Sequence, residues 1–255
     1  MTANYLMMTL DTIFKCGILI EDTDDCQGYK VAVSKDTPHQ IHRDAIRANL
    51  NKYTRQAYNM LPKMDAPRIL DIGCGSGVPT IELTKLSNGE IIGLDNDKTE
   101  LDKLARKLKE EGLADRVRVV ECSMSGLDFP DASFDIIWAE GSIAAVGFRK
   151  GLEEWRRFLK PHGFLVVHDE IQNLEKKLEQ VSICGYELLG HFRLSEEVWW
   201  NEYYAPLDRQ VREQLRQHID DPDVLSLLEK EQKEIDMFKE NPRLFQSVFI
   251  IMRKG

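Results

Sequence analysis

The chain has 255 residues, of which 42% are hydrophobic and 30% are charged. This is the composition of a folded globular protein with room for one sizeable α/β core and further elements, and it excludes a disordered chain. The formal net charge of −9 opposes binding to nucleic acid, whose phosphates require a basic surface, and opposes docking on anionic membranes. We therefore expect no nucleic-acid partner and no membrane partner.

The cysteines and the N-terminal stretch bear on location. Five cysteines are scattered without CxxC spacing, which is typical of reduced thiols in a cytosolic protein and offers no clustered metal ligands. Asp11 and Lys15 interrupt the apolar residues 1–20, which lack a basic n-region and a cleavage site. We expect a cytoplasmic protein without signal peptide, membrane anchor or metal. Two β-like runs flank an acidic stretch within residues 17–33, where a hairpin is one option.

The pattern then predicts a helix, followed by strands and helices in alternation. Apolar residues recur at helical spacing over residues 38–61, with Arg47 on another face. One later helix opens at the N-cap Asp97 and ends at Gly112, and another stops at residues 160–163. Near-continuous apolar runs are typical of strands buried on both faces of a parallel sheet. The predicted strands of this part span residues 68–72, 90–94, 116–121, 134–139 and 164–168.

The C-terminal part completes the predicted sheet. Residues 186–194 and 245–252 have strand patterns, and two helical stretches lie between them. We expect an α/β, Rossmann-like, doubly wound and mostly parallel seven-stranded sheet. The helical insertion before the last strand would form part of a lid or an oligomer contact, so a homodimer is one option. The expected division is an N-terminal extension with a lid helix (1–62), a core (63–195), the insertion (196–244) and the final core strand (245–255).

The strongest motif joins the first strand to the next helix. It reads LDIGCGSG over residues 70–77, and such glycines let the backbone turn tightly against a ligand. Val78 stands where a dinucleotide-binding loop requires its third glycine, so a nicotinamide-dependent oxidoreductase is disfavoured. Asp71, ahead of the first glycine, would repel a pyrophosphate but suits a ligand with an ammonium group and a positive sulfonium.

Two further marks follow the next two strands. Asp95 ends the second strand, 24 residues after Asp71, where an acidic residue can accept hydrogen bonds from both ribose hydroxyls. Cys122, Ser123 and Met124 follow the third strand, where an adenine ring would lie. The three marks therefore occur in the order that a cationic nucleoside cofactor requires.

Residues 68–170 resemble the class I S-adenosylmethionine-dependent methyltransferases. They look closest to the branch that contains the ubiquinone and menaquinone C-methyltransferases and many small-molecule enzymes. The resemblance implies S-adenosylmethionine as the cofactor and a small molecule as the methyl acceptor. The matching stretches are residues 69–77 (ILDIGCGSG), 93–97 (GLDND), 127–135 (LDFPDASFD) and 158–164 (FLKPHGF).

The same resemblance implies the residues that bind the cofactor. Asp71 and the loop backbone would hold its methionine part, and Asp95 its ribose. Asn96 would flank the adenine, while Ser123 and Met124 would close on the adenine edge. The family often has Asp at the position of Ser123, and a serine binds the adenine amine without charge. The implied cofactor-binding set is Asp71, Gly73, Cys74, Gly75, Ser76, Gly77, Asp95, Asn96, Ser123, Met124 and Glu140.

Of three candidate catalytic residues, two follow strand ends, where ligands of such sheets bind, and the third precedes the inserted helices. Glu140 could orient the acceptor or touch the methionine ammonium, or it could only cap the next helix. His168 could be a general base or a structural histidine, and with Asp169 and Glu170 it could ligate a metal. Tyr203 belongs to an aromatic group that could wall an acceptor pocket or could pack a lid on the core. This group is Trp199, Trp200, Tyr203 and Tyr204.

The sequence thus predicts an enzyme that positions an acceptor for in-line displacement of a methyl group from a sulfonium. A base is needed only if the acceptor must lose a proton. Two alternatives stay open: a protein methyltransferase, and a non-catalytic module that binds S-adenosylmethionine. The acceptor and the methylated atom are not readable from these residues.

Overall fold

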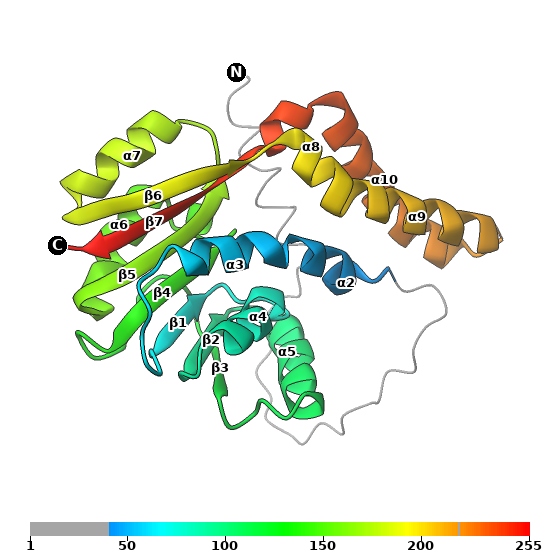
Figure 1. The fold of residues 1–255 in the computed structure, drawn as a ribbon. Helices are drawn as coiled ribbons and strands as arrows, with labels where there is room; N and C mark the ends of the chain where they lie inside the picture. The colour runs from blue at the N-terminus through cyan, green and yellow to red at the C-terminus, as the bar shows by residue number, and fades with distance from the viewer. Residues whose placement is uncertain (1–40, 219) are drawn as a thin grey trace.

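The computed structural model describes residues 41–218 and 220–255 (Figure 1). The predictions for residues 1–40, including the hairpin within residues 17–33, lie outside the described residues. The seven strands form one sheet in the order β3-β2-β1-β4-β5-β7-β6, in which β7 runs antiparallel to the other six. The strands are β1 (Ile69–Ile72), β2 (Ile91–Asp95), β3 (Val117–Glu121), β4 (Phe134–Glu140), β5 (Leu159–Glu170), β6 (Tyr186–Leu194) and β7 (Ser247–Lys254).

Helices cover both faces of this sheet, which confirms the predicted doubly wound fold. Side chains that alternate along each strand enter two separate cores, as Ile69 and Leu70 of β1 illustrate. The core of Ile69 includes α4, α5, the N-terminal helices and the C-terminal helices, whereas the core of Leu70 includes α6 and α7. The helices are α2 (Arg43–Arg47), α3 (Asn51–Asn59), α4 (Val78–Leu86), α5 (Lys98–Glu110), α6 (Phe148–Trp155), α7 (Leu174–Ile183), α8 (Glu196–Trp199), α9 (Ala205–Gln217) and α10 (Pro222–Glu240).

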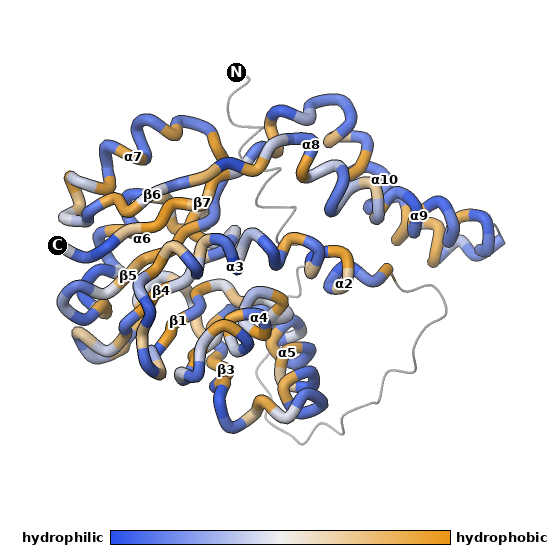
Figure 2. Tube along the Cα trace, viewed as in Figure 1, coloured by the Kyte–Doolittle hydropathy of each residue, from blue (hydrophilic) through white to orange (hydrophobic). Residues whose placement is uncertain are grey.

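Local signals explain where α5 begins and ends. The Asp97 side chain accepts hydrogen bonds from the backbone N–H groups of Thr99 (2.8 Å) and Glu100 (3.2 Å), as an N-cap does. Gly112 has a φ of 68°, the left-handed conformation that glycine adopts at a helix C-terminus. Hydrophobic and hydrophilic residues alternate along α5, as they do along α9 and α10, because each helix buries one face (Figure 2).

Two predicted boundaries were wrong. The helix expected over residues 38–61 is, in its described part, two helices separated by a 3-10 turn, Ala48–Leu50. Residues 160–163, expected to stop a helix, belong to β5; the preceding helical turns end at Phe158. Leu159 already pairs with Phe134, and the register shifts before Phe164 pairs with Ile136, so residues 160–163 form an irregular part of the strand.

The helices α2 and α3 lie across the molecule between the strands β1 and β4 and the paired helices α9 and α10 (Figure 1). Segments far apart in the sequence therefore meet at one side of the sheet. No helix in the described residues is long and apolar enough to cross a membrane.

Candidate active site

The loop between β1 and α4 is tied to the end of β2. The backbone N–H groups of Gly73 and Cys74 donate to the Leu94 carbonyl at 2.8 and 2.9 Å, and Gly77 N–H donates to the Cys74 carbonyl at 2.9 Å. These bonds hold the loop at the carboxyl end of the sheet, where parallel α/β folds bind ligands.

The three loop glycines have different roles. All three have positive φ values, 75° at Gly73, 51° at Gly75 and 82° at Gly77. A Cβ on Gly73 would lie 2.4 Å from Ser142 Cβ, and one on Gly77 would lie 2.1 Å from Leu104 Cδ1. A Cβ on Gly75 would meet nothing within 4 Å. Gly73 and Gly77 thus allow close packing, while Gly75 leaves open space on the ligand side of the loop.

Asp95 links the loop to the end of β2. One carboxylate oxygen accepts from Gly75 N–H and the other from Asp97 N–H, each at 2.9 Å. A carboxylate oxygen has a second lone pair, so Asp95 keeps acceptor capacity for ligand hydroxyl groups. The ribose-binding role of Asp95 stays a prediction.

Asp71 is fully enclosed beneath the loop. Its side chain is 1% exposed and accepts a hydrogen bond from Thr80 Oγ1 at 2.6 Å. Burial, opposed by the Thr80 bond and reinforced by the charges of Glu140 and Asp95, raises the pKa of Asp71 to about 7. A cationic group nearby would favour the ionised form, so this carboxyl suits the ammonium end of a ligand.

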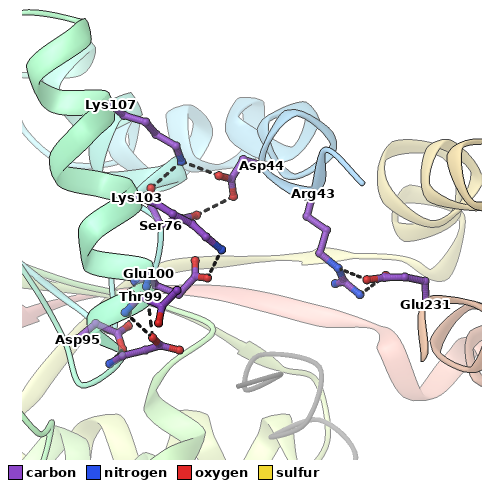
Figure 3. Close-up of polar contacts among 11 residues, drawn as sticks. Arg43, Asp44, Ser76, Asp95, Thr99, Glu100, Lys103, Lys107 and Glu231 are labelled. Atoms are coloured by element: carbon purple, nitrogen blue, oxygen red, sulfur yellow. Dashed lines mark hydrogen bonds and ion pairs between the residues drawn. The ribbon is translucent and has the colours of Figure 1, made fainter. Parts of the chain in front are cut away.

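The remaining predicted cofactor residues surround the same loop. Ser76 Oγ donates to Asp44 on α2 at 2.6 Å, and Lys107 donates to Asp44 and to the Ser76 carbonyl, both at 2.7 Å (Figure 3). Asn96 and Ser123 are exposed, whereas Met124 is half-buried with its sulfur beside Gly73.

Cys74 is a small buried group within the loop. Burial raises the pKa of its thiol well above the usual value, so the thiol stays protonated. Its side chain belongs to the core that includes Ile69 and Ile91. We therefore assign Cys74 a packing role and expect its backbone, not its sulfur, to face a ligand.

The carboxylate of Glu140, at the end of β4, contacts two side chains from the N-terminal helices. Arg47 Nη2 binds its Oε1 at 2.6 Å, Thr54 Oγ1 lies 3.2 Å from both carboxylate oxygens, and Trp138 Nε1 donates to Oε2 at 3.0 Å. The Glu140 side chain is only 2% exposed. Although burial opposes ionisation, the charge of Arg47 and these hydrogen bonds hold the pKa of Glu140 below its usual range. Glu140 is therefore a paired, ionised carboxylate.

His168, the aligned neighbour of Glu140 on β5, is 3% exposed and lies among aromatic rings. Its ring stacks on Phe249 at a centroid distance of 4.3 Å and lies parallel to Trp199 at 6.1 Å. His168 Nε2 lies 2.8 Å from Ser247 Oγ, which also accepts from Trp199 Nε1 at 3.0 Å. Burial lowers the pKa of His168 to about 4, so the ring is neutral near pH 7.

Tyr203 connects the aromatic group to α2. Its hydroxyl accepts from Arg43 Nη1 at 2.8 Å, and the same guanidinium binds Glu231 and Glu234 of α10 (Figure 3 shows Glu231). Burial raises the pKa of the Tyr203 phenol above its usual value. The aromatic neighbours of Tyr203 pack on the helical insertion, since Tyr204 stacks on Phe238 at 4.2 Å.

Two of the three candidate catalytic residues contact arginines of α2. Arg47 binds Glu140 at 2.6 Å, and Arg43 donates to the Tyr203 hydroxyl at 2.8 Å. The one signal in the sequence is the spacing of Arg43 and Arg47, four residues apart on a helical pattern and hence on one helix face.

Residues 169 and 170 do not complete a metal site in the structure. Asp169 forms an ion pair with Lys177 at 2.6 Å. Within residues 41–218 and 220–255, no group of three or more His, Cys, Asp or Glu side chains is placed to hold a metal ion.

Known proteins resemble this chain in sequence. Residues 69–163 match the model of a methyltransferase domain family. A sterol 24-C-methyltransferase of Gibberella zeae is 27% identical over 175 residues, which cover 57% of this chain and 46% of that protein. The chain therefore spans about half the length of this curated relative.

Two solved structures are similar in fold. The [4+2]-cyclase SpnF has a TM-score of 0.65 and 19% identity, and the match covers 80% of this chain and 81% of the other. A SAM-dependent methyltransferase from Thiobacillus denitrificans in complex with S-adenosyl-L-homocysteine has a TM-score of 0.64 and 15% identity, covering 83% and 98%. The family match covers residues 69–163, and the two solved structures show that the chain shares their fold.

Proposed function

We propose that this protein transfers the methyl group of S-adenosylmethionine to a small organic molecule. The observation that carries the proposal is the pair of acidic residues at neighbouring strand ends, Asp71 beneath the glycine loop and Asp95 bonded to it. Open space at Gly75 leaves room for the ligand between them. A pyrophosphate would be repelled there, whereas a sulfonium nucleoside with an ammonium tail is complementary.

The proposed catalytic residues are those that lie on the far side of this site. Glu140 would orient the acceptor through Arg47, and Tyr203 would wall the acceptor side. His168 would contact the acceptor from β5, since its imidazole is neutral and keeps one nitrogen unengaged. Each assignment is a proposal that rests on this placement.

The acceptor class is argued from charge and from the relatives. A net charge of −9 does not suit a nucleic-acid acceptor, and the sterol relative is named for a small-molecule acceptor. The similarity to a structure named as a cyclase means that this fold does not by itself fix the reaction. We keep the kinship to the ubiquinone and menaquinone C-methyltransferase branch, the cytoplasmic location and the homodimer as further predictions.

Two measurements test the proposed function. Isothermal titration with S-adenosylmethionine and S-adenosylhomocysteine should detect 1:1 binding, and Asp95→Asn should weaken it. Asp102→Asn is the matched control, because Asp102 is an exposed acidic residue on α5 that, among residues 41–218 and 220–255, pairs only with Lys98. No binding of either ligand at millimolar concentration would refute the proposal.

Transfer itself is then followed with radiolabelled methyl groups. Incubation with a panel of small molecules should move label into an extractable organic product. Label in a protein band would instead indicate a protein methyltransferase, and binding without any transfer would indicate a non-catalytic module.

A further inference from the structure

Two buried nitrogen atoms beside Glu140 have no hydrogen-bond partner among the described residues. They are Arg47 Nη1 and His168 Nδ1. In each side chain a second nitrogen is engaged, Arg47 Nη2 with Glu140 at 2.6 Å and His168 Nε2 with Ser247 at 2.8 Å. A buried polar group left unpaired costs about 1–3 kcal/mol, so two of them at one place indicate a ligand that completes them.

The hydrogen bonds behind His168 indicate which of its nitrogens carries the proton. Trp199 Nε1 can only donate, so Ser247 Oγ is the acceptor of that bond. The Ser247 hydroxyl hydrogen is then available for His168 Nε2. We assign the Ser247 hydroxyl hydrogen to His168 Nε2, which places the imidazole proton on Nδ1. The unpaired nitrogen is therefore a hydrogen-bond donor, as Arg47 Nη1 also is.

Both donors adjoin the proposed cofactor site. Glu140 and His168 are aligned on the neighbouring strands β4 and β5, and Arg47 reaches Glu140 from α2. Asp71 of β1 pairs with Trp138 of β4, so Glu140, two residues further along β4, lies beside the end of β1 where the loop begins. The two donors are thus on the acceptor side of the same strand ends.

The charges of this cluster select the kind of group that fits. Arg47 and Glu140 form a buried ion pair without net charge, and His168 is neutral. An anionic ligand would be buried near Asp71 and Glu140 without a free countercharge, which is costly. A neutral oxygen can accept both hydrogen bonds without this penalty.

We propose that Arg47 Nη1 and His168 Nδ1 bind the oxygen of a neutral carbonyl or hydroxyl group on the methyl acceptor. The two side chains are acceptor-binding residues, which select oxygen-bearing molecules and orient them toward the cofactor. This inference rests on the proposed function, because that function places the cofactor beside them.

The test uses the full chain saturated with S-adenosylhomocysteine and three probes of similar shape. Acetophenone carries a neutral carbonyl, ethylbenzene lacks the oxygen, and benzoate carries a carboxylate. In protein labelled with ¹⁵N-histidine, the free imidazole should show a protonated Nδ1. Acetophenone should shift this resonance and bind at least about ten-fold more tightly than ethylbenzene, as one hydrogen bond to a charged donor implies. Benzoate should bind no better than ethylbenzene.

A matched pair of variants locates the effect. His168→Gln keeps a polar group toward Ser247 but removes the donor at the position of Nδ1, whereas His168→Asn keeps a donor there. Preference for acetophenone over ethylbenzene should disappear in His168→Gln and persist in His168→Asn. Arg47→Lys, which keeps the charge beside Glu140, should reduce the preference about ten-fold. Affinity for S-adenosylhomocysteine should be unchanged in all three and confirms that each variant is folded.

The outcomes separate the two proposals. If S-adenosylhomocysteine does not bind, the proposed function fails. If it binds but acetophenone shows no binding, or no preference over ethylbenzene, only the acceptor-oxygen inference fails. A wild-type imidazole protonated on Nε2, or tighter binding of benzoate than of acetophenone, would also overturn it.

Discussion

The two sides of the candidate site are built in different ways. On the cofactor side, Asp71, the glycine loop and Asp95 lie within 25 residues of one another and are joined mostly by backbone hydrogen bonds. On the acceptor side, Glu140 binds Arg47, Tyr203 binds Arg43, and His168 is the strand neighbour of Glu140, although these residues are far apart in the sequence. A cofactor site can therefore be encoded locally, whereas an acceptor site depends on how distant segments are brought together.

Helix α2 connects the two sides. Two of its adjacent residues point in different directions (Figure 3). Asp44 contacts Ser76 and Lys107 near the loop, whereas Arg43 contacts Glu231 on α10. Arg47, one turn along, reaches Glu140. Loss of these contacts should therefore affect the acceptor side more than the cofactor side, and four predictions test this difference.

The largest effect is expected for Arg47→Met. It leaves the carboxylate of Glu140, 2% exposed, without its cationic partner, and breaking such a buried pair costs about 3–5 kcal/mol. The free energy of unfolding from urea titration should fall by this amount. The double variant Arg47→Met/Glu140→Gln removes both charges and should recover most of the loss; a double variant as unstable as the single one would contradict the account.

The second prediction concerns the pH dependence created by Asp71. Its pKa is about 7 in the folded protein and near 3.8 when unperturbed, so the folded state retains a proton that the unfolded state loses. The stability that the protonated Asp71 contributes to the folded state is fully present below the unperturbed pKa of 3.8. It is lost as the pH rises through the folded-state pKa of about 7. Asp71→Asn does not ionise, so its stability relative to wild type should rise by about 2–3 kcal/mol from pH 5 to pH 8.

Thermal unfolding of the ligand-free protein at the two pH values measures this difference. Asp102→Asn, which changes an exposed carboxylate, is the control and should show no such trend. A constant difference between Asp71→Asn and wild type across the range would show that Asp71 is ionised throughout.

The third prediction separates the two ends of the cofactor. Asp95→Asn should weaken both adenosine and S-adenosylhomocysteine about ten-fold, because both carry the ribose. Asp71→Asn should weaken only S-adenosylhomocysteine, since adenosine has no ammonium tail. Equal effects of the two variants on adenosine, measured by calorimetry, would mean that the two carboxylates do not face different parts of the ligand.

The smallest effect is expected at the contact between α2 and α10. Arg43 is one-third exposed and shares its charge with Glu231 and Glu234. Solvent screening limits such contacts, so Arg43→Ala should destabilise the protein by about 1 kcal/mol. Affinity for adenosine should stay unchanged, because the cofactor side does not use Arg43; a weaker affinity would mean that the two sides are not separable in this way.

The sequence was sufficient for the parts of the molecule that follow local rules. Apolar runs predicted all seven strands, and Asp97 and Gly112 marked the two ends of α5 because capping depends on neighbouring residues. The start of β5 was missed, because the irregular pairing of residues 160–163 with β4 is a tertiary feature.

The contacts on the acceptor side could not be predicted from local sequence patterns, because they join distant residues. The bond of Arg47 to Glu140 spans 93 residues, and that of Arg43 to Glu231 spans 188, so no spacing rule relates them. Ser247 and Thr54 gave no signal either, since a serine or threonine in a strand or helix becomes a specific partner only once His168 or Glu140 is placed against it.

The most direct test of the central claim is a crystal structure with S-adenosylhomocysteine bound. We predict that the ribose hydroxyls lie within hydrogen-bond distance of Asp95, that the amino-acid tail lies over Asp71 and the Gly75 backbone, and that the sulfur faces Glu140 and His168. A nucleoside bound elsewhere, or one whose sulfur faces away from Glu140 and His168, would contradict the account.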